Sequence, residues 1–246
     1  MNEPAIANHE VFTRTSGLKD NLGAVGEIVA MLLAVTVGLA LGGLTGVLVL
    51  SPILGTLAGL GVATLFLRRH GKTWADLGLR RPQKWLRAFL LAMAGLIVTI
   101  VMIGVVAKPL ASALGLAPPD ISLLVDAIEG NLTNYLLFLI PVSWGSAAIG
   151  EEMLARGFIL NRVCAITGYN RLGTVIAIIT QAFVFALGHL YQGAAGAIDV
   201  FVLALVFGGL YTVSRRNLVS CILLHGLVDT IAMTLLYLGY ADLAGG

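Results

Sequence analysis

The sequence predicts an all-α protein, a polytopic bundle of about seven membrane-spanning helices. Of its 246 residues, 58% are hydrophobic and only 11% are charged, whereas about 25% are charged in an ordinary soluble domain. Uncharged segments close to the ~20 residues that a helix needs to cross a bilayer take up most of the chain. We therefore expect a single membrane domain over residues 25–246. It follows a short polar tail, residues 1–24, which lacks the apolar core of a signal peptide.

The spans can be placed from the uncharged segments. Residues 28–67 contain no charged side chain, which is enough for two crossings with a reversal among Gly42, Gly43, Gly46, Ser51 and Pro52. Residues 108–134 form the longest predicted external segment, in which a short amphipathic helix is expected. The chain shows no internal repeat, which disfavours the transporter folds built from duplicated halves. The five later spans are expected at residues 86–106, 135–150 with a helical continuation, 172–190, 195–213 and 218–238.

The basic residues predict that the N-terminus lies in the cytoplasm. This orientation places 14 of the 15 Lys and Arg residues on the cytoplasmic side and leaves only Lys108 outside, a strong positive-inside bias. Topology thus accounts for the net charge of +2, and no nucleic-acid partner is expected. Cys164 and Cys221 lie near the predicted cytoplasmic ends of spans, where free thiols are expected rather than a disulfide.

Several ionisable residues fall at or near membrane depth, where a buried charge costs several kcal/mol. Glu27 and Asp199 lie close to helix ends, where we expect their carboxylates to reach water. The others need a structural or functional reason: Glu151, Glu152, Arg156, His189, His225 and Asp229.

The segment "EEMLAR", residues 151–156, places two carboxylates beside one arginine. Glu152 and Arg156 are four residues apart with the acid first, the better order for an ion pair within a helix. Glu151 is then left unpaired, and a like charge in a low-dielectric setting makes a carboxylate a stronger base. The pattern alone would also fit a charge network between helices or a solvated helix end.

Two more pairs with a spacing of four follow. The ring of Phe185 can pack against the imidazole of His189, although this pattern alone would also fit an interfacial or core histidine. Asp229 can accept the proton of one nitrogen of His225 and leave the other nitrogen directed inward. That pair alone would equally fit a structural hydrogen bond or a proton relay.

Taken in order, Glu-Glu-x-x-x-Arg, Phe-x-x-x-His and His-x-x-x-Asp, each on its own predicted membrane helix, resemble the motifs of the CPBP family of intramembrane proteases. This family includes the type II CAAX prenyl endopeptidases and the bacterial Abi proteins. The resemblance covers residues 130–240. The basic segment "KTWADLGLRRP", residues 72–82, is also similar to the stretch that often precedes the family's next membrane helix.

The resemblance implies a role for each matching position. Glu151 and His189 would activate the attacking water, and Glu152, Arg156 and Phe185 would support the site. His225 would stabilise the oxyanion. Asp229 stands where many members carry asparagine, and an ionised aspartate can accept but not donate a hydrogen bond. We therefore expect Asp229 to hold His225.

Two questions stay open from the sequence. Glu151, His189 and His225 would also be a plausible zinc ligand set, so a metalloprotease is an alternative to direct activation of water, which we favour with no obligatory metal. His189 is predicted near the outer end of its span, whereas His225 lies deeper. The helix that carries His189 must therefore tilt, start deep near "CAITGYN" (residues 164–170), or have another boundary.

The expected function is that of an intramembrane endopeptidase in a prokaryotic cytoplasmic membrane, because the compact chain is similar to the family's prokaryotic branch. Its partners would be the bilayer and membrane-embedded or membrane-associated peptide substrates, including lipid-modified ones. Two other classes remain as alternatives: a proton-coupled carrier, and a non-enzymatic interaction or immunity protein. The carrier would also bury Glu, His and Asp residues, whereas the interaction protein would not need Glu151.

Overall fold

The computed structural model describes residues 10–244 and contains helices and turns but no strand over that range. Six helices in this part of the chain are long and apolar enough to cross a membrane, which confirms the predicted helical membrane bundle. The remaining predicted span, residues 172–190, corresponds to α8 (Arg171–Leu187), an apolar helix of only 17 residues. The six long helices are Leu18–Gly43, Leu50–Arg69, Trp85–Ala113, Leu132–Thr167, Leu190–Val213 and Leu218–Tyr237.

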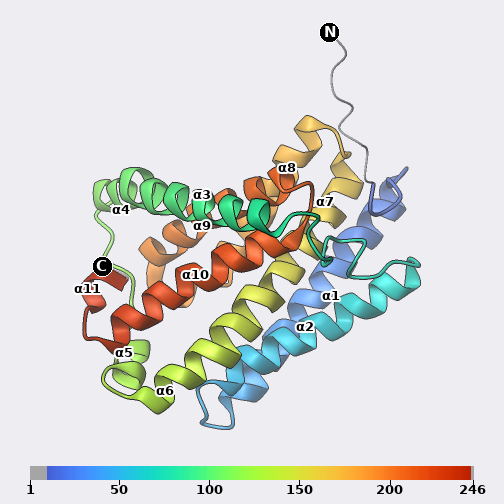
Figure 1. Ribbon diagram of the computed structural model, residues 1–246. Helices are drawn as coiled ribbons and strands as arrows, with labels where there is room; N and C mark the ends of the chain where they lie inside the picture. Colours follow the sequence, from blue (N-terminus) through green and yellow to red (C-terminus); the bar gives the residue numbers. More distant parts are fainter. Residues whose placement is uncertain (1–9, 245–246) are drawn as a thin grey trace.

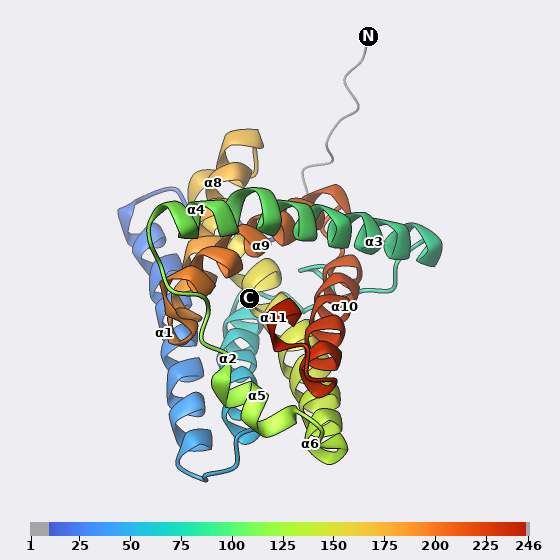
Figure 2. The same ribbon diagram turned by 90° about the vertical axis from the view of Figure 1, so that its left-hand side faces the viewer.

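Helices α1 (Leu18–Gly43) and α2 (Leu50–Arg69) form a hairpin and lie side by side along much of their length (Figures 1 and 2). Their reversal occurs within the predicted glycine-rich stretch. A side chain at Gly38 would overlap the backbone of Leu54, and one at Gly42 would overlap that of Ser51. Small residues thus let the two helix backbones approach closely, as is common between membrane helices.

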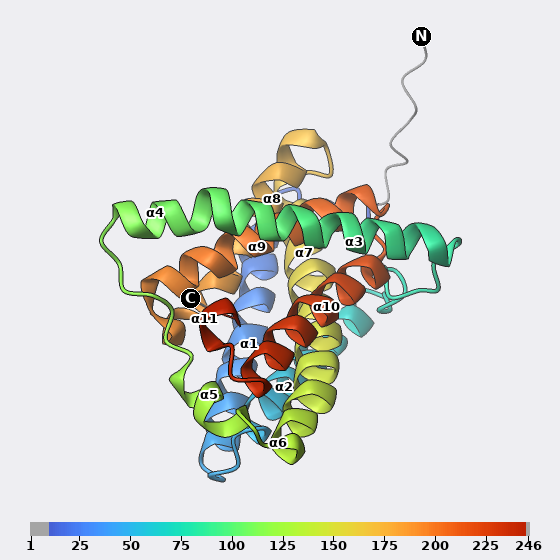
Figure 3. The same cartoon turned by 60° about the vertical axis from the view of Figure 1, so that its left-hand side comes forward.

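Helix α3 (Trp85–Met102) continues through a π-helical turn, Ile103–Ala107, into α4 (Lys108–Ala113). This run lies across the rest of the bundle (Figures 2 and 3). Lys108 does not begin a loop, contrary to the sequence-based prediction, because the helix ends only near Gly115, which has a positive φ of 65°. Pro109 does not end the helix, because it falls in the first turn of α4, where its missing N–H is tolerated. The short helix expected in the following loop is α5 (Ser122–Ile128).

The segment that carries the two glutamates is one long helical run with unusual hydrogen bonding. It starts as α6 (Leu132–Leu137), continues as two π-helices, Phe138–Glu151 and Met153–Ile159, and ends as α7 (Leu160–Thr167). Glu152 lies at the junction of the two π-helices. Such π-helical turns are rare in proteins, and those that occur are often found at functional sites.

The chain reverses after α7 and enters α8, and this turn projects at the top of the bundle (Figures 1 to 3). The side chain of Asn170 caps α8 by accepting a hydrogen bond from the N–H of Gly173. A 3₁₀ turn, Leu190–Gln192, links α8 to α9 (Gly193–Val213). Helix α10 (Leu218–Tyr237) and the short α11 (Ala241–Ala244) complete the fold.

At ~1.5 Å per residue, α8 is about 25 Å long, less than the ~30 Å of hydrocarbon in a bilayer. His189 was expected on this helix, but α8 ends at Leu187 and His189 starts the following 3₁₀ turn. The helix boundary therefore differs from the predicted one, which is one of the three solutions expected from the sequence.

We call the segments 10–17, 70–84, 168–170 and 214–217 the basic end of the bundle. The N–H of Phe12 donates to the hydroxyl of Tyr169, 3.0 Å away, and burial raises the pKa of Tyr169 to about 12. The hydroxyl of Tyr211 donates to the carbonyl of Leu77 at 2.7 Å. These contacts fix the connecting segments onto the helix ends.

Glu27 is not a solvated carboxylate, contrary to expectation. Its Oε2 lies 2.9 Å from the guanidinium of Arg162, and its Oε1 lies 2.9 Å from the imidazole of His70. Within the expected polar tail, α1 already begins at Leu18, and Phe12 is buried under the guanidinium of Arg162 at 4.6 Å. The remainder of the tail, residues 1–9, lies outside the described residues.

Candidate active site

A fully buried ion pair forms the base of the site. Arg156 Nη1 donates to Glu152 Oε1 at 2.8 Å, and both side chains have 0% exposure. This confirms the pair expected from the spacing of four. A second, weaker hydrogen bond joins Arg156 Nη2 to the carbonyl of Ala204 on α9 at 3.4 Å. Because an unpaired buried charge is costly, each partner depends on the other.

Two phenylalanine rings flank the guanidinium of Arg156. The ring centroid of Phe185 on α8 lies 4.8 Å from Arg156 Cζ, and that of Phe207 on α9 lies 5.0 Å away. Each ring also contacts a histidine of the site, because Phe185 lies 4.7 Å from His189 and Phe207 lies 5.4 Å from His225. Each phenylalanine thus lies between Arg156, which it contacts by cation–π attraction, and one of the imidazoles, which it contacts ring to ring.

His225 is tied to the same carboxylate. Its Nδ1 lies 2.8 Å from Glu152 Oε1, and because a carboxylate only accepts, Nδ1 carries the proton. Nε2 lies 3.7 Å from Asp229 Oδ1, which is within ion-pairing range but beyond a hydrogen bond. The sequence had assigned Asp229 as the residue that holds His225. In the structure Glu152 accepts the hydrogen bond of His225, and Asp229 is the more distant neighbour.

Glu151 differs from Glu152 in having no strong partner. Its side chain is half-buried, and within residues 10–244 it forms no hydrogen bond or ion pair. It still lies in electrostatic reach of His225 and Asp229. The unpaired state that the sequence predicted for Glu151 is therefore present.

His189 points its second nitrogen away from the backbone. Nδ1 lies 2.9 Å from the carbonyl oxygen of Phe185, which only accepts, so Nδ1 carries the proton and Nε2 is left as a base. The packing of His189 against Phe185 confirms the contact expected from their spacing. His189 also lies in electrostatic reach of Asp229, so residues of four chain segments converge on one region.

The described residues do not form a metal centre. No three His, Cys, Asp or Glu side chains between residues 10 and 244 are grouped so that they could hold a metal ion. Of the alternative zinc set, His225 uses Nδ1 for Glu152, and His189 uses Nδ1 for a carbonyl. Glu151, His189 and His225 thus do not form a preassembled ligand group, and we derive no chemical step through a metal.

Comparison with known protein families identifies the same region of the chain. Residues 133–231 match the family model described as type II CAAX prenyl endopeptidase Rce1-like. Over these residues the chain contains an Rce1-like domain. The matched segment lies within residues 130–240, over which the sequence resembles the CPBP proteases, and it contains all the candidate site residues. No curated protein and no solved structure gives a match to the chain.

The Rce1-like domain implies that the protein is an intramembrane protease. The six membrane-length helices agree with an integral membrane protein. The motif residues come from separate elements of the Rce1-like domain: the glutamates from the π-helical run, His189 from the turn after α8, and His225 from α10.

Sequence reasoning missed several residues that position the site of this Rce1-like protein. Trp144 packs its ring against α10 at Gly226, where an added Cβ would lie 2.5 Å from ring atoms, and its Nε1 donates to Thr230 Oγ1 at 3.1 Å. These contacts fasten the π-helix to α10 next to His225. Phe207 was also missed. The glycine directly after His225 was an available signal for a close approach, whereas nothing in the spacing indicated Phe207.

Proposed function

We propose that this protein is an intramembrane endopeptidase that hydrolyses peptide bonds of membrane-embedded or membrane-associated substrates, with water activated by Glu151 and His189. One observation carries the proposal: Arg156 and His225 both bind Glu152, whereas Glu151 beside it is unpaired. An unpaired carboxylate next to two imidazoles is suited to take a proton from water. Glu152 has the complementary role of orienting His225.

The reaction follows from these positions. Glu151 accepts a proton from water, and the hydroxide attacks the carbonyl carbon of the peptide bond. His225, held through Nδ1, donates from a protonated Nε2 to the oxyanion that develops. His189 and Glu151 pass the proton to the leaving amine as the C–N bond breaks, which yields one carboxylate and one free amine. The low dielectric of the bundle strengthens each of these electrostatic contributions.

Asp229 has a supporting role in this proposal. Its carboxylate lies 3.7 Å from Nε2 of His225 and interacts electrostatically with Glu151 and His189. An anion at this place helps to keep the imidazole oriented, but it cannot donate to an oxyanion. We therefore assign oxyanion stabilisation to His225 alone.

We propose that the reaction takes place in a membrane whose cytoplasmic side faces the basic end of the bundle. The positive-inside bias supports an N-terminus in the cytoplasm, with the basic end of the bundle facing the cytoplasm. The resemblance to the family's prokaryotic branch supports a prokaryotic membrane. Substrates would be membrane proteins or peptides, including lipid-modified ones, that present a peptide bond to this site.

A comparison of membrane proteomes tests the proposal. Cells that produce the Glu151→Gln variant should accumulate at least one membrane-associated precursor that is shortened when the wild-type protein is present. A matched control is Glu129→Gln, which changes an acid outside the site. If neither precursor nor product differs between wild type and Glu151→Gln at equal protein levels, the protease assignment of this site is wrong, and a carrier or interaction protein becomes the better account.

A further inference from the structure

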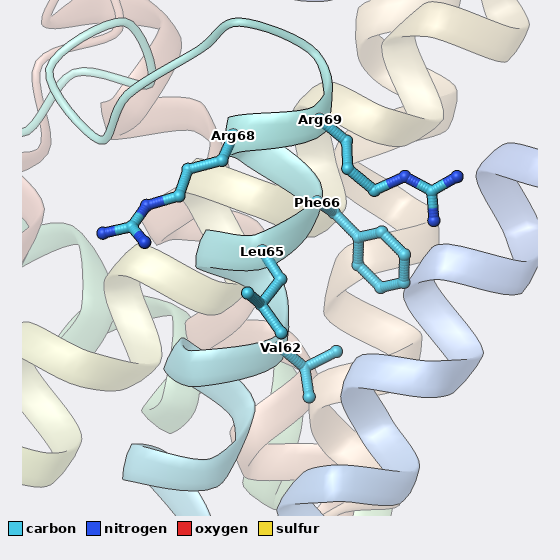
Figure 4. A pocket seen from close by; sticks show the side chains of 5 residues that line it. All are labelled: Val62, Leu65, Phe66, Arg68 and Arg69. Atoms are coloured by element: carbon cyan, nitrogen blue, oxygen red, sulfur yellow. The ribbon is translucent and has the colours of Figure 1, made fainter.

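An apolar groove runs along α2 at the basic end, away from the candidate active site. It has a volume of about 570 Å³ and is lined by Val62, Leu65, Phe66, Arg68 and Arg69. Figure 4 shows the three apolar side chains below the two arginines, whose guanidinium groups extend to opposite sides of α2. The volume is within the ~300–1,000 Å³ that is typical of small-molecule sites.

The two arginines are the last two residues of the α2 span, Leu50–Arg69. Basic residues at the ends of membrane helices are expected at the level of the lipid headgroups, with the apolar residues before them in the hydrocarbon. Both side chains are exposed, and neither forms an ion pair with an acid of the described chain. Glu27, which is the acid paired nearby, is already bound to Arg162 and His70.

The floor of the groove is fixed by the core. The ring of Phe66 stacks on Phe158 with 6.5 Å between centroids and 22° between planes, and Phe158 is completely buried. Phe158 belongs to the π-helix that also carries Arg156. Phe66 is therefore held in place, and a molecule bound against it would stabilise the packing of α2 on this helix.

We propose that this groove is a binding site for an anionic phospholipid. An acyl chain would lie along Val62, Leu65 and Phe66, and the phosphate of the headgroup would bind Arg68, Arg69 or both. Planar guanidinium groups bind phosphate with two hydrogen bonds each, and basic pockets at the ends of membrane helices attract anionic headgroups. A zwitterionic lipid would fill the same apolar groove but would gain less from the two cations. This site is independent of the proposed proteolysis.

The amount of each lipid that the protein retains tests the proposal directly. The purified full-length protein is mixed with phosphatidylglycerol and phosphatidylcholine in equal amounts, and retained lipids are counted by native mass spectrometry. The wild type should prefer phosphatidylglycerol and should be thermally stabilised by it. The Arg68→Gln/Arg69→Gln variant should bind it roughly 30-fold more weakly, which is the loss expected for two interfacial basic residues. The control Arg80→Gln/Arg81→Gln removes the same charge from the basic end outside the groove and should bind as the wild type does.

A second pair of variants tests whether the apolar part of the groove binds the acyl chain. Leu65→Asn introduces an amide into the groove and should weaken retention, whereas Leu33→Asn on α1 should not, although the two leucines are equally exposed, at 60% and 61%. Equal losses in the two double-arginine variants would show a diffuse positive surface and overturn the proposal. So would displacement of the lipid by millimolar inorganic phosphate, which would show a simple anion site, or unchanged retention in Leu65→Asn.

Discussion

Removing Arg156 tests whether the ion pair at the base of the site is truly buried. The Arg156→Ala variant strands the carboxylate of Glu152, which has no exposure. Breaking a buried pair in this way costs about 3–5 kcal/mol, and the loss of the two cation–π contacts adds to it. The hydrogen bond from His225 Nδ1 to Glu152 remains and offsets part of the loss. We therefore expect the free energy of unfolding to fall by ~3–5 kcal/mol in total.

A double variant separates the stranded charge from the lost packing. Glu152→Gln/Arg156→Met removes both charges and keeps most of the volume, so it should lose less stability than Arg156→Ala. Reversible denaturant titrations in mixed micelles give the free energy of unfolding for each variant. Arg215→Ala is a matched control, because it removes an arginine from the turn between α9 and α10. If Arg156→Ala is as stable as the wild type, the pair is solvated and the site is not built on a buried salt bridge.

Three further outcomes are expected. In the orientation proposed, Lys72→Cys should react with a membrane-impermeant maleimide only after the cytoplasmic face is opened. Reaction in intact cells would show that the topology is the opposite one. The native thiols are fully buried and should not interfere. Gly226→Ala should cost ~1–3 kcal/mol because of overlap with Trp144, whereas Gly209→Ala, with open space around it, should be neutral or slightly stabilising. A strong chelator should leave peptide cleavage largely unchanged, and reversible loss of activity restored by zinc, with about one metal per chain, would favour the metalloprotease instead.

Much of the fold could be predicted from the sequence because hydrophobicity and charge decide what can lie in a bilayer. The hairpin of α1 and α2 and the positions of α9 and α10 followed from uncharged length and from glycine-rich turns. The end of α4 was missed, because a proline in a first helical turn does not stop a helix. The shortness of α8 was missed because its apolar sequence continues past the residue at which the helix ends.

The candidate site was predictable where its contacts are local. Glu152 and Arg156, and Phe185 and His189, are four residues apart, and spacing alone indicated their contacts. The hydrogen bond between His225 and Glu152 joins residues 73 positions apart, so only the fold could reveal it. The same applies to Glu27, whose two partners come from other segments and change a residue expected to be solvated into a paired one.

The most direct test of the central claim is the cleavage rate of purified protein on a membrane-embedded peptide in liposomes, measured for the wild type and for Glu151→Gln. The substitution keeps shape and hydrogen bonding but removes the base, so the rate should fall by ~100-fold or more. The unfolding transition should stay unchanged, because Glu151 forms no hydrogen bond or ion pair within the described residues. A folded Glu151→Gln protein that cleaves at the wild-type rate would contradict the assignment of Glu151 as the residue that activates water.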